Sequence, residues 1–210
     1  ERFDREQRPR GLTMLHPIAA GYMFGIRGVD HIAKPGLMAR IIGGSYPSGP
    51  STSEPPRIWQ MLGNNEVAAY NVPSGIMFDL MREAAAKRPG VITKVGLDTF
   101  VDPDQEGCAM NGAAAAAPIV RKIEFDGEDW LYFPSIVPHV AIIRGSVCDE
   151  RGNLSFGQEG AYLGAMELAL AGWNSGACDT EWSGSAATTC GFSALQLGLP
   201  QCDFLHASRI

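Results

Sequence analysis

The sequence lacks an uninterrupted apolar run long enough to cross a bilayer, and it lacks any run of basic residues. Without such an apolar run, no membrane-spanning helix is expected. Basic residues are also outnumbered, and the formal net charge is -6. This balance argues against nucleic acid or an anionic membrane surface as the partner. A small molecule or a protein is therefore the expected partner.

Metal-binding and disulfide patterns are also missing. The five cysteines include no Cys-x-x-Cys pair, and the four histidines are widely spaced. These spacings predict neither a disulfide framework nor a metal site. Reduced thiols are typical of a cytoplasmic protein, and the charged first ten residues do not resemble a secretory signal.

What is present fits a globular α/β domain. The 210 residues are 45% hydrophobic, enough for one sizeable core. Apolar periodicity from Ile76 to Ala85 predicts a helix that ends at Lys87–Gly90. Short apolar runs predict strands on both sides of it, at 67–70 and 91–97. This order of strand, helix and strand is typical of a βαβ unit. Two further elements at 12–20 and 37–42, and a short helix at 57–63, are expected before it.

The second half predicts a hairpin followed by a buried strand. Residues 119–125 and 127–133 flank a turn at Phe125–Glu128. The β-branched run Val140–Ile143 predicts a central strand buried on both faces. A helix is expected at 158–171, and no further strand is visible before about Phe192.

The ends of the predicted strands are rich in turn-forming residues. The loops after Ile42, Tyr70, Leu97 and Ile143 each carry glycine, which allows the backbone to approach a ligand closely. Ligands of open α/β sheets bind outside the carboxyl ends of the strands. We therefore expect these loops to form a binding cleft, with residues 93–111 as one wall.

An ordered set of motifs carries a resemblance to a known family. The main ones are RGVDHIA (27–33), RIIGG (40–44), AYNVPSG (69–75), PGVITKVGLDTFVDP (89–103), FDGEDWL (125–131) and VAIIRGS (140–146). From Arg2 to about Gly176 the chain resembles family I CoA-transferases of the acetate/propionate and 3-oxoacid type. It departs from the family pattern at several places, among them the two that follow. Ser45–Pro47 replaces the usual His-Trp-Gly, and Ser74 replaces a glutamine.

The resemblance implies a NagB/RpiA-like layered α/β domain with a mostly parallel sheet, truncated at both ends. Residues 1–176 would be an incomplete N-terminal, α-subunit-like domain of the family. Residues 177–210 form an atypical tail that contains no lysine and holds three of the five cysteines. We hypothesise that this tail is read out of frame through a coding-sequence error.

The resemblance also implies an enzyme that exchanges CoA between short-chain acyl-CoA and carboxylates through a glutamyl-CoA intermediate. The family's glutamate nucleophile would lie outside this chain, so the chain contains no catalytic residue and should be inactive alone. Acyl-CoA is a substrate and no cofactor or metal is implied. A cytoplasmic homo-oligomer in short-chain fatty acid or ketone body metabolism is the expected setting.

The candidate substrate-binding residues come from the strand-end loops. They are Gly43, Gly44, Asn71, Ser74, Gly75, Thr99, Phe100, Gly107 and Asn111. The competing interpretation is structural: Asn and Ser favour turns, paired glycines form tight turns, and Phe100 could be a core residue. Glu159 is not a candidate nucleophile, because a carboxylate at a helix start is favoured by the helix dipole.

Two other functions stay open at this point. The chain could be a non-catalytic fragment or decayed copy that binds acyl-CoA or a partner chain. A weaker alternative is a sugar-phosphate isomerase on the same fold. That reaction would need a carboxylate and a lysine together in the cleft, where Lys94 is the only nearby lysine.

Overall fold

The structure is a computed structural model that describes residues 2–18, 28–46, 55–143, 146–148, 154–158, 164–174 and 179–182. It contains two compact units, Glu1–Leu80 with Gly90–Pro134, and Met81–Pro89 with Ser135–Ile210. The elements of the first unit are α1 (Arg2–Glu6), β1 (Leu12–His16), η1 (Gly28–His31), β2 (Met38–Gly43), α2 (Arg57–Gly63), β3 (Ala68–Asn71), α3 (Ser74–Ala85, which continues into the second unit), β4 (Gly90–Thr93), α4 (Gly112–Ala115), β5 (Arg121–Phe125) and β6 (Glu128–Pro134). The predicted α/β class is confirmed.

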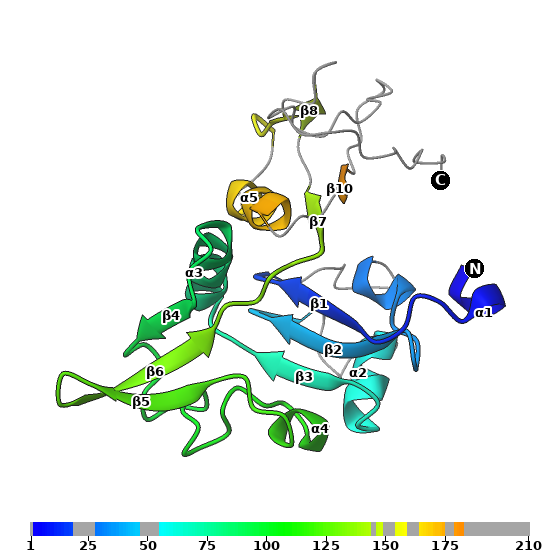
Figure 1. Cartoon of the computed structure of the whole chain (residues 1–210). Helices are drawn as coiled ribbons and strands as arrows, with labels where there is room; N and C mark the ends of the chain where they lie inside the picture. The colour runs from blue at the N-terminus through cyan, green and yellow to red at the C-terminus, as the bar shows by residue number, and fades with distance from the viewer. Residues whose placement is uncertain are drawn as a thin grey trace. The chain divides into compact units, whose positions relative to one another are not determined.

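Strands β1, β2 and β3 form a parallel sheet in that order (Figure 1). In the last pairing of the register, His16 lies beside Gly43 and Gly43 beside Asn71. All three strands therefore end at one line. We call the residues that follow this line (16–18, 43–46 and 71–75) the carboxyl edge.

One face of the parallel sheet packs against α2. Ile58 and Met61 of α2 are buried with Ile41 of β2 and Ala69 of β3, and Met14 of β1 packs against the same cluster. Side chains alternate between the two faces of a strand. His16, Gly43 and Asn71 lie two positions after Met14, Ile41 and Ala69, at the ends of the three strands. They therefore lie on the α2 face as well.

The amino end of α2 is held by a buried carboxylate from a distant segment. Asp30 is 1% exposed, and its two oxygens accept hydrogen bonds from the N–H groups of Arg57 (2.7 Å) and Ile58 (3.0 Å). Pro56, in the capping position itself, provides no side-chain cap. Asp30 therefore supplies from η1 the cap that the helix sequence lacks.

A second sheet in the first unit is antiparallel, with the order β4-β6-β5. The predicted hairpin is confirmed: β5 and β6 are joined by Asp126 and Gly127, both with positive φ (54° and 74°). An Asp-Gly pair with positive φ at both positions is the favoured two-residue hairpin turn.

The predicted strand at 91–97 is confirmed as far as Thr93, but its extension to residue 97 and its parallel pairing are wrong. β4 ends at Thr93, whose hydroxyl accepts a hydrogen bond from the Val95 N–H at 3.0 Å and starts a turn. Gly96 then takes a positive φ of 100°, which no extended strand accommodates. Within the described residues, β4 pairs antiparallel with β6 and not with β3, so hairpin pairing takes the place of the expected βαβ geometry.

Residues 99–108 form a series of turns around the carboxylate of Asp102. This side chain is 1% exposed, accepts hydrogen bonds from the N–H groups of Asp98 (3.1 Å) and Asp104 (3.0 Å), and lies 3.0 Å from the Lys122 ammonium. Burial is the largest single influence and raises the pKa of Asp102. The two N–H groups and Lys122 together outweigh it and hold the pKa below its ordinary value.

This lowered pKa predicts a stability that depends on pH. Because the pKa of Asp102 is lower in the folded state, its contribution is complete above the unfolded pKa and is lost as pH falls through the folded pKa. Replacing Asp102 with asparagine should cost about 1 kcal/mol at pH 7, because it removes the negative charge that the two N–H groups and Lys122 stabilise. Urea unfolding of both proteins from pH 7 to pH 3 should show the difference narrowing below about pH 4. A difference that stays constant across this range would contradict the assignment.

The second unit contains β7 (Val140–Ile143), β8 (Val147–Cys148), β9 (Leu154–Ser155), α5 (Ala165–Asn174) and β10 (Asp179–Trp182). Strand β10 pairs in parallel with β7, so β7, α5 and β10 form a βαβ unit that the apolar pattern does not reveal. The expected burial of β7 on both faces is wrong. Ala141 is buried against Gly172 of α5, whereas Val140 and Ile142 are 51% and 61% exposed.

The predicted helix at 158–171 begins later and ends later than expected, at Ala165 and Asn174. Residues 159–163, including Glu159, and most of the tail after Gly176 lie outside the described residues. None of the described helices has the length and apolar character needed to span a membrane.

Candidate functional site

The carboxyl edge is assembled by backbone hydrogen bonds between consecutive strand ends. The Gly44 N–H donates to the His16 carbonyl (2.9 Å), and the Val72 N–H donates to the Gly43 carbonyl (2.8 Å). The Asn71 N–H donates to the Cys108 carbonyl (2.9 Å), which brings this part of the predicted wall segment against the edge. These three peptide donors are therefore already engaged within the protein.

Both glycines of the RIIGG motif are required by close packing. A Cβ on Gly43 would lie 2.4 Å from Cε1 of the His16 ring. A Cβ on Gly44 would lie 2.0 Å from the Pro17 carbonyl oxygen and 2.4 Å from the Ser74 hydroxyl oxygen. No side chain fits at either position without displacement. The structural reason for these glycines is therefore contact between neighbouring loops.

The amino end of α3 begins at this edge. Met77 N–H donates to the Pro73 carbonyl (3.1 Å), which makes the preceding N–H groups of Ser74, Gly75 and Ile76 the first-turn donors without an intrahelical partner. The Ser74 hydroxyl donates to the Pro17 carbonyl (2.7 Å), and nothing lies within 4 Å of a Cβ built on Gly75. Together with the helix dipole, these N–H groups favour an anion or a polarised carbonyl at this end.

His16 is a residue of this edge that is not among the nine candidates predicted from the sequence. It is the last residue of β1 and is 5% exposed. Its ring stacks edge-to-face on Tyr46 at a centroid distance of 5.6 Å, and its Nδ1 lies 3.0 Å from the Ile18 carbonyl oxygen. Burial lowers the pKa of His16, partly opposed by the Ile18 contact. The signal in the sequence was a histidine that closes a mostly apolar strand.

The nine predicted site residues are not all in one place. Gly43, Gly44, Asn71, Ser74 and Gly75 are brought together at the carboxyl edge. Residues 108–110 run antiparallel to β3, with Ala109 opposite Tyr70. That direction carries the chain from the carboxyl end of β3 back to its amino end, where Asn111 lies.

Asn111 is engaged in structural hydrogen bonds. Its side-chain NH₂ donates to the carbonyls of Leu62 (3.0 Å) and Val67 (2.8 Å), and its Oδ1 accepts from the N–H of Ala114 (3.0 Å). Asn111 is also the cap of α4. The expectation that Asn111 and Asn71 line one cleft is therefore corrected: these two residues lie at opposite ends of β3.

The other residues of the wall segment have mixed roles. The Thr99 hydroxyl donates to the Gly96 carbonyl (2.8 Å) within a turn, and the Phe100 carbonyl accepts from the Cys108 N–H (2.9 Å). The Phe100 side chain is 42% exposed, so it is not a core residue. Gly107 is buried with a positive φ of 58°.

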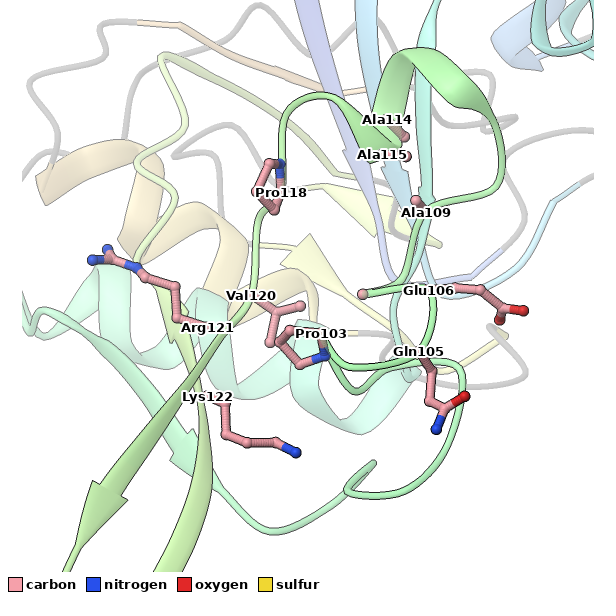
Figure 2. A pocket seen from close by; sticks show the side chains of 11 residues that line it. Pro103, Gln105, Glu106, Ala109, Ala114, Ala115, Pro118, Val120, Arg121 and Lys122 are labelled. Atoms are coloured by element: carbon pink, nitrogen blue, oxygen red, sulfur yellow. The ribbon is translucent and has the colours of Figure 1, made fainter.

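A separate depression lies on the other part of the wall segment. It has a volume of about 550 Å³ and includes Gly107 alone among the predicted site residues. Figure 2 shows the side chains around it, among them Arg121 and Lys122 from β5. No residue of the carboxyl edge lines it. Lys122 is already paired with Asp102 and Asp104, so we place the candidate site at the carboxyl edge instead.

The remaining reactive side chains of the described residues do not form a catalytic cluster. No group of three potential metal ligands occurs among them. Burial raises the pKa of the Cys108 thiol to about 12, which keeps it protonated. Lys94 pairs with Glu128 at 2.7 Å and lies over the Trp130 ring of the antiparallel sheet. It is therefore not at the carboxyl edge, where the isomerase alternative would need it.

Comparison with known proteins identifies the family. The coenzyme A transferase family matches residues 6–176. The chain belongs to the coenzyme A transferase family. This family assignment confirms the resemblance drawn from the motifs, and it covers every residue of the carboxyl edge.

Relatives of this coenzyme A transferase chain are much longer than the chain. It is 34% identical to acetate CoA-transferase YdiF of Escherichia coli (strain K12) and 37% identical to caffeate CoA-transferase of Acetobacterium woodii. Each match extends over 176 residues, 84% of this chain and 32% of the relative. The chain therefore spans about a third of the length of these curated relatives.

Solved structures support the same fold. The acyl-CoA transferase YdiF from E. coli O157:H7, described as a thioester complex with CoA, superimposes with a TM-score of 0.74 at 31% identity. That match covers 89% of this chain and 36% of that chain. Glutaconate coenzyme A-transferase from Acidaminococcus fermentans, at 14% identity and a TM-score of 0.58, supports the fold alone.

Proposed function

We propose that this chain supplies the acyl-CoA-binding part of an enzyme that exchanges CoA between short-chain acyl-CoA and carboxylates. The observation that carries the proposal is the family match over residues 6–176 combined with the carboxyl edge. At that edge, a close-packed glycine pair and the first turn of α3 meet at the ends of three parallel strands.

The proposed reaction uses a glutamate that lies outside these 210 residues. Its carboxylate attacks the thioester carbonyl, and CoA leaves as a thiolate while an acyl-glutamyl anhydride forms. The thiolate then attacks the glutamyl carbonyl, which releases the first carboxylate and leaves a glutamyl-CoA thioester. The acceptor carboxylate reverses these steps. The crystal structure of YdiF described as a thioester complex with CoA supports this intermediate for a relative.

The carboxyl edge would stabilise the charge that develops on oxygen in these steps. Each attack turns a carbonyl oxygen into an oxyanion. The first-turn N–H groups of Ser74, Gly75 and Ile76 are donors with a fixed direction, reinforced by the helix dipole. The open space beside Gly75 leaves room for a carbonyl to approach them.

We propose acyl-CoA and a short-chain carboxylate as substrates, without a resident cofactor. A further polypeptide would complete the enzyme, in a cytoplasmic assembly of several copies. The coverage of 32% of YdiF supports a contribution from residues outside this chain. A match to the α subunit of the acetoacetyl-CoA:acetate/butyrate CoA transferase of Clostridium acetobutylicum (25% identity over 126 residues) supports an assembly of more than one chain.

The test is CoA exchange between acetyl-CoA and isotopically labelled propionate. We expect none with the 210-residue chain alone. We expect exchange after addition of a polypeptide that corresponds to the unmatched two thirds of YdiF, with a CoA thioester located by mass spectrometry on a glutamate of the added polypeptide. The added polypeptide without this chain is the control.

Two outcomes would contradict the proposal. Sustained exchange by the 210-residue chain alone would show that the nucleophile lies within it. Failure of the mixture to exchange CoA, with both polypeptides folded and associated, would refute the proposed activity.

A further inference from the structure

His16 has a buried ring nitrogen that none of the described residues satisfies. The residue is 5% exposed, and its Nε2 has no hydrogen-bond partner within the described part of the chain. A buried polar atom without a partner costs stability, and proteins rarely keep one without a reason. His16 lies at the carboxyl edge, where the substrate is proposed to bind.

The hydrogen-bonding character of Nε2 follows from the other ring nitrogen. Nδ1 lies 3.0 Å from the carbonyl oxygen of Ile18. A carbonyl oxygen can only accept, so Nδ1 must carry the proton. Burial lowers the pKa of His16, which keeps the ring neutral at pH 7. A neutral ring with the proton on Nδ1 presents Nε2 as an acceptor, and an acceptor requires a donor.

The Tyr46 hydroxyl is not that donor. The Tyr46 ring packs edge-to-face on His16, but its hydroxyl donates to the Tyr70 carbonyl (2.8 Å). Burial raises the pKa of Tyr46 well above its ordinary value, so the hydroxyl keeps its single proton. Gly43, which lies beneath the imidazole, has no side chain to offer.

The position of Nε2 points to a ligand on the α2 face of the edge. Nε2 lies 2.8 Å from the place that a Cβ of Gly43 would occupy, so the ring extends from β1 across β2. Asn71 of β3 is next in the same row of the register and shares this face through the alternation of the strands. His16 and Asn71 thus lie on either side of Gly43, which has no side chain.

We propose that Nε2 of His16 accepts a hydrogen bond from a hydroxyl group on the acyl chain, so that this chain prefers hydroxyacyl-CoA over its unsubstituted counterpart. The inference rests on the proposed function, because it places an acyl-CoA at the carboxyl edge. A site with a buried acceptor discriminates against a ligand that leaves the acceptor unpaired. No charge needs to be buried, since donor and acceptor are both neutral.

The protonation state can be tested directly. Long-range ¹H–¹⁵N correlation of the histidine rings in the 210-residue chain should show His16 with a proton on Nδ1 and a bare Nε2 at pH 7. The His16→Gln spectrum assigns the signal by its disappearance. A proton on Nε2, or a doubly protonated ring at pH 7, would overturn the inference.

The preference is tested by calorimetric titration of the same chain with matched thioester pairs. These are lactyl-CoA against propionyl-CoA, and 3-hydroxybutyryl-CoA against butyryl-CoA. In the unmodified chain, we expect the hydroxyacyl member of at least one pair to bind about tenfold more tightly. His16→Leu should remove that preference and leave the affinity for the unsubstituted member unchanged. His16→Gln, which can place an amide oxygen near the Nε2 position, should retain part of it.

Controls separate this role from a structural one. His31 is exposed, and His31→Leu should retain the full preference. Thermal unfolding of both His16 variants shows whether each is folded. If His16→Leu folds poorly, the binding data for His16→Gln decide the test.

Three outcomes of the calorimetric titrations would overturn the inference. Equal binding of both members of each pair by the unmodified chain would do so while leaving the proposed function intact. Equal weakening of all four thioesters in the folded His16 variants would assign the donor to the CoA moiety rather than to the acyl hydroxyl. Absence of binding for every thioester would refute the proposed acyl-CoA site itself, and the inference with it.

Discussion

Replacing Gly44 with alanine is expected to destabilise the first unit by about 3 kcal/mol. The added Cβ would lie 2.0 Å from the Pro17 carbonyl oxygen, a distance that no real Cβ contact shows. Backbone must therefore move, and Gly44 N–H is itself bonded to the His16 carbonyl at 2.9 Å. Relief of the clash would break that bond or the contact of Ser74 with Pro17. Urea unfolding monitored by circular dichroism measures the loss.

The matched control is Gly63→Ala at the end of α2. A Cβ on Gly63 meets nothing within 4 Å, so the same chemical change adds no clash there. Alanine also has the higher helix propensity, and the variant should unfold within about 1 kcal/mol of the unmodified chain. Equal free energies of unfolding for the two variants would contradict the packing described at Gly44.

The glycine pair illustrates what the sequence alone could predict. Gly43 and Gly44 follow an apolar run, and the tendency of ligands to bind beyond strand ends predicted that they belong to a site. The fold confirmed that both lie at the carboxyl edge with Asn71. Their actual requirement is contact with His16, Pro17 and Ser74 from other loops. Such contacts depend on strand order, which no local pattern contains.

β4 shows why the rest of the fold was harder to predict. Its apolar residues fit a strand of a parallel sheet as well as a strand paired with a hairpin. The antiparallel pairing of β4 is determined by β6, whose residues 131–134 pair with Gly90–Thr93 from about 40 residues away. Pairing between strands so far apart in the sequence depends on tertiary contacts, which outweigh local strand preference. The predicted cleft wall at 93–111 assumed such a parallel strand before it; in the structure this segment meets the carboxyl edge at Cys108.

The surroundings of His16 and Asn111 could not be predicted from the sequence, for the same physical reason. A lone histidine and a lone asparagine carry no spacing information, so their roles depend on which partners the fold provides. Asn111 meets two backbone carbonyls and the start of α4, which satisfies its side chain. His16 meets one carbonyl and leaves Nε2 unpaired. The same kind of polar side chain is thus structural at one end of the sheet and available at the other.

Asn111→Ala should cost about 2–4 kcal/mol of unfolding free energy. The substitution removes the NH₂ bonds to the carbonyls of Leu62, which still accepts from the Asn65 N–H, and of Val67, and it removes the cap of α4. Loss of a cap costs about 1 kcal/mol, and each unsatisfied buried group costs about 1–3 kcal/mol before relaxation. Asn64→Ala, which removes only an exposed hydrogen bond to Glu66, should cost less than about 1 kcal/mol.

Asn111→Asp separates the two roles of this side chain. Aspartate is a good helix cap and can still accept from the Ala114 N–H, but it cannot donate to Leu62 and Val67. Its negative charge would also face two carbonyl oxygens. We therefore expect Asn111→Asp to be at least as destabilising as Asn111→Ala in urea unfolding. If aspartate instead restored the stability of the unmodified chain, capping alone would explain Asn111. The NH₂ bonds that hold the loop before β3 to α4 would then carry no measurable energy.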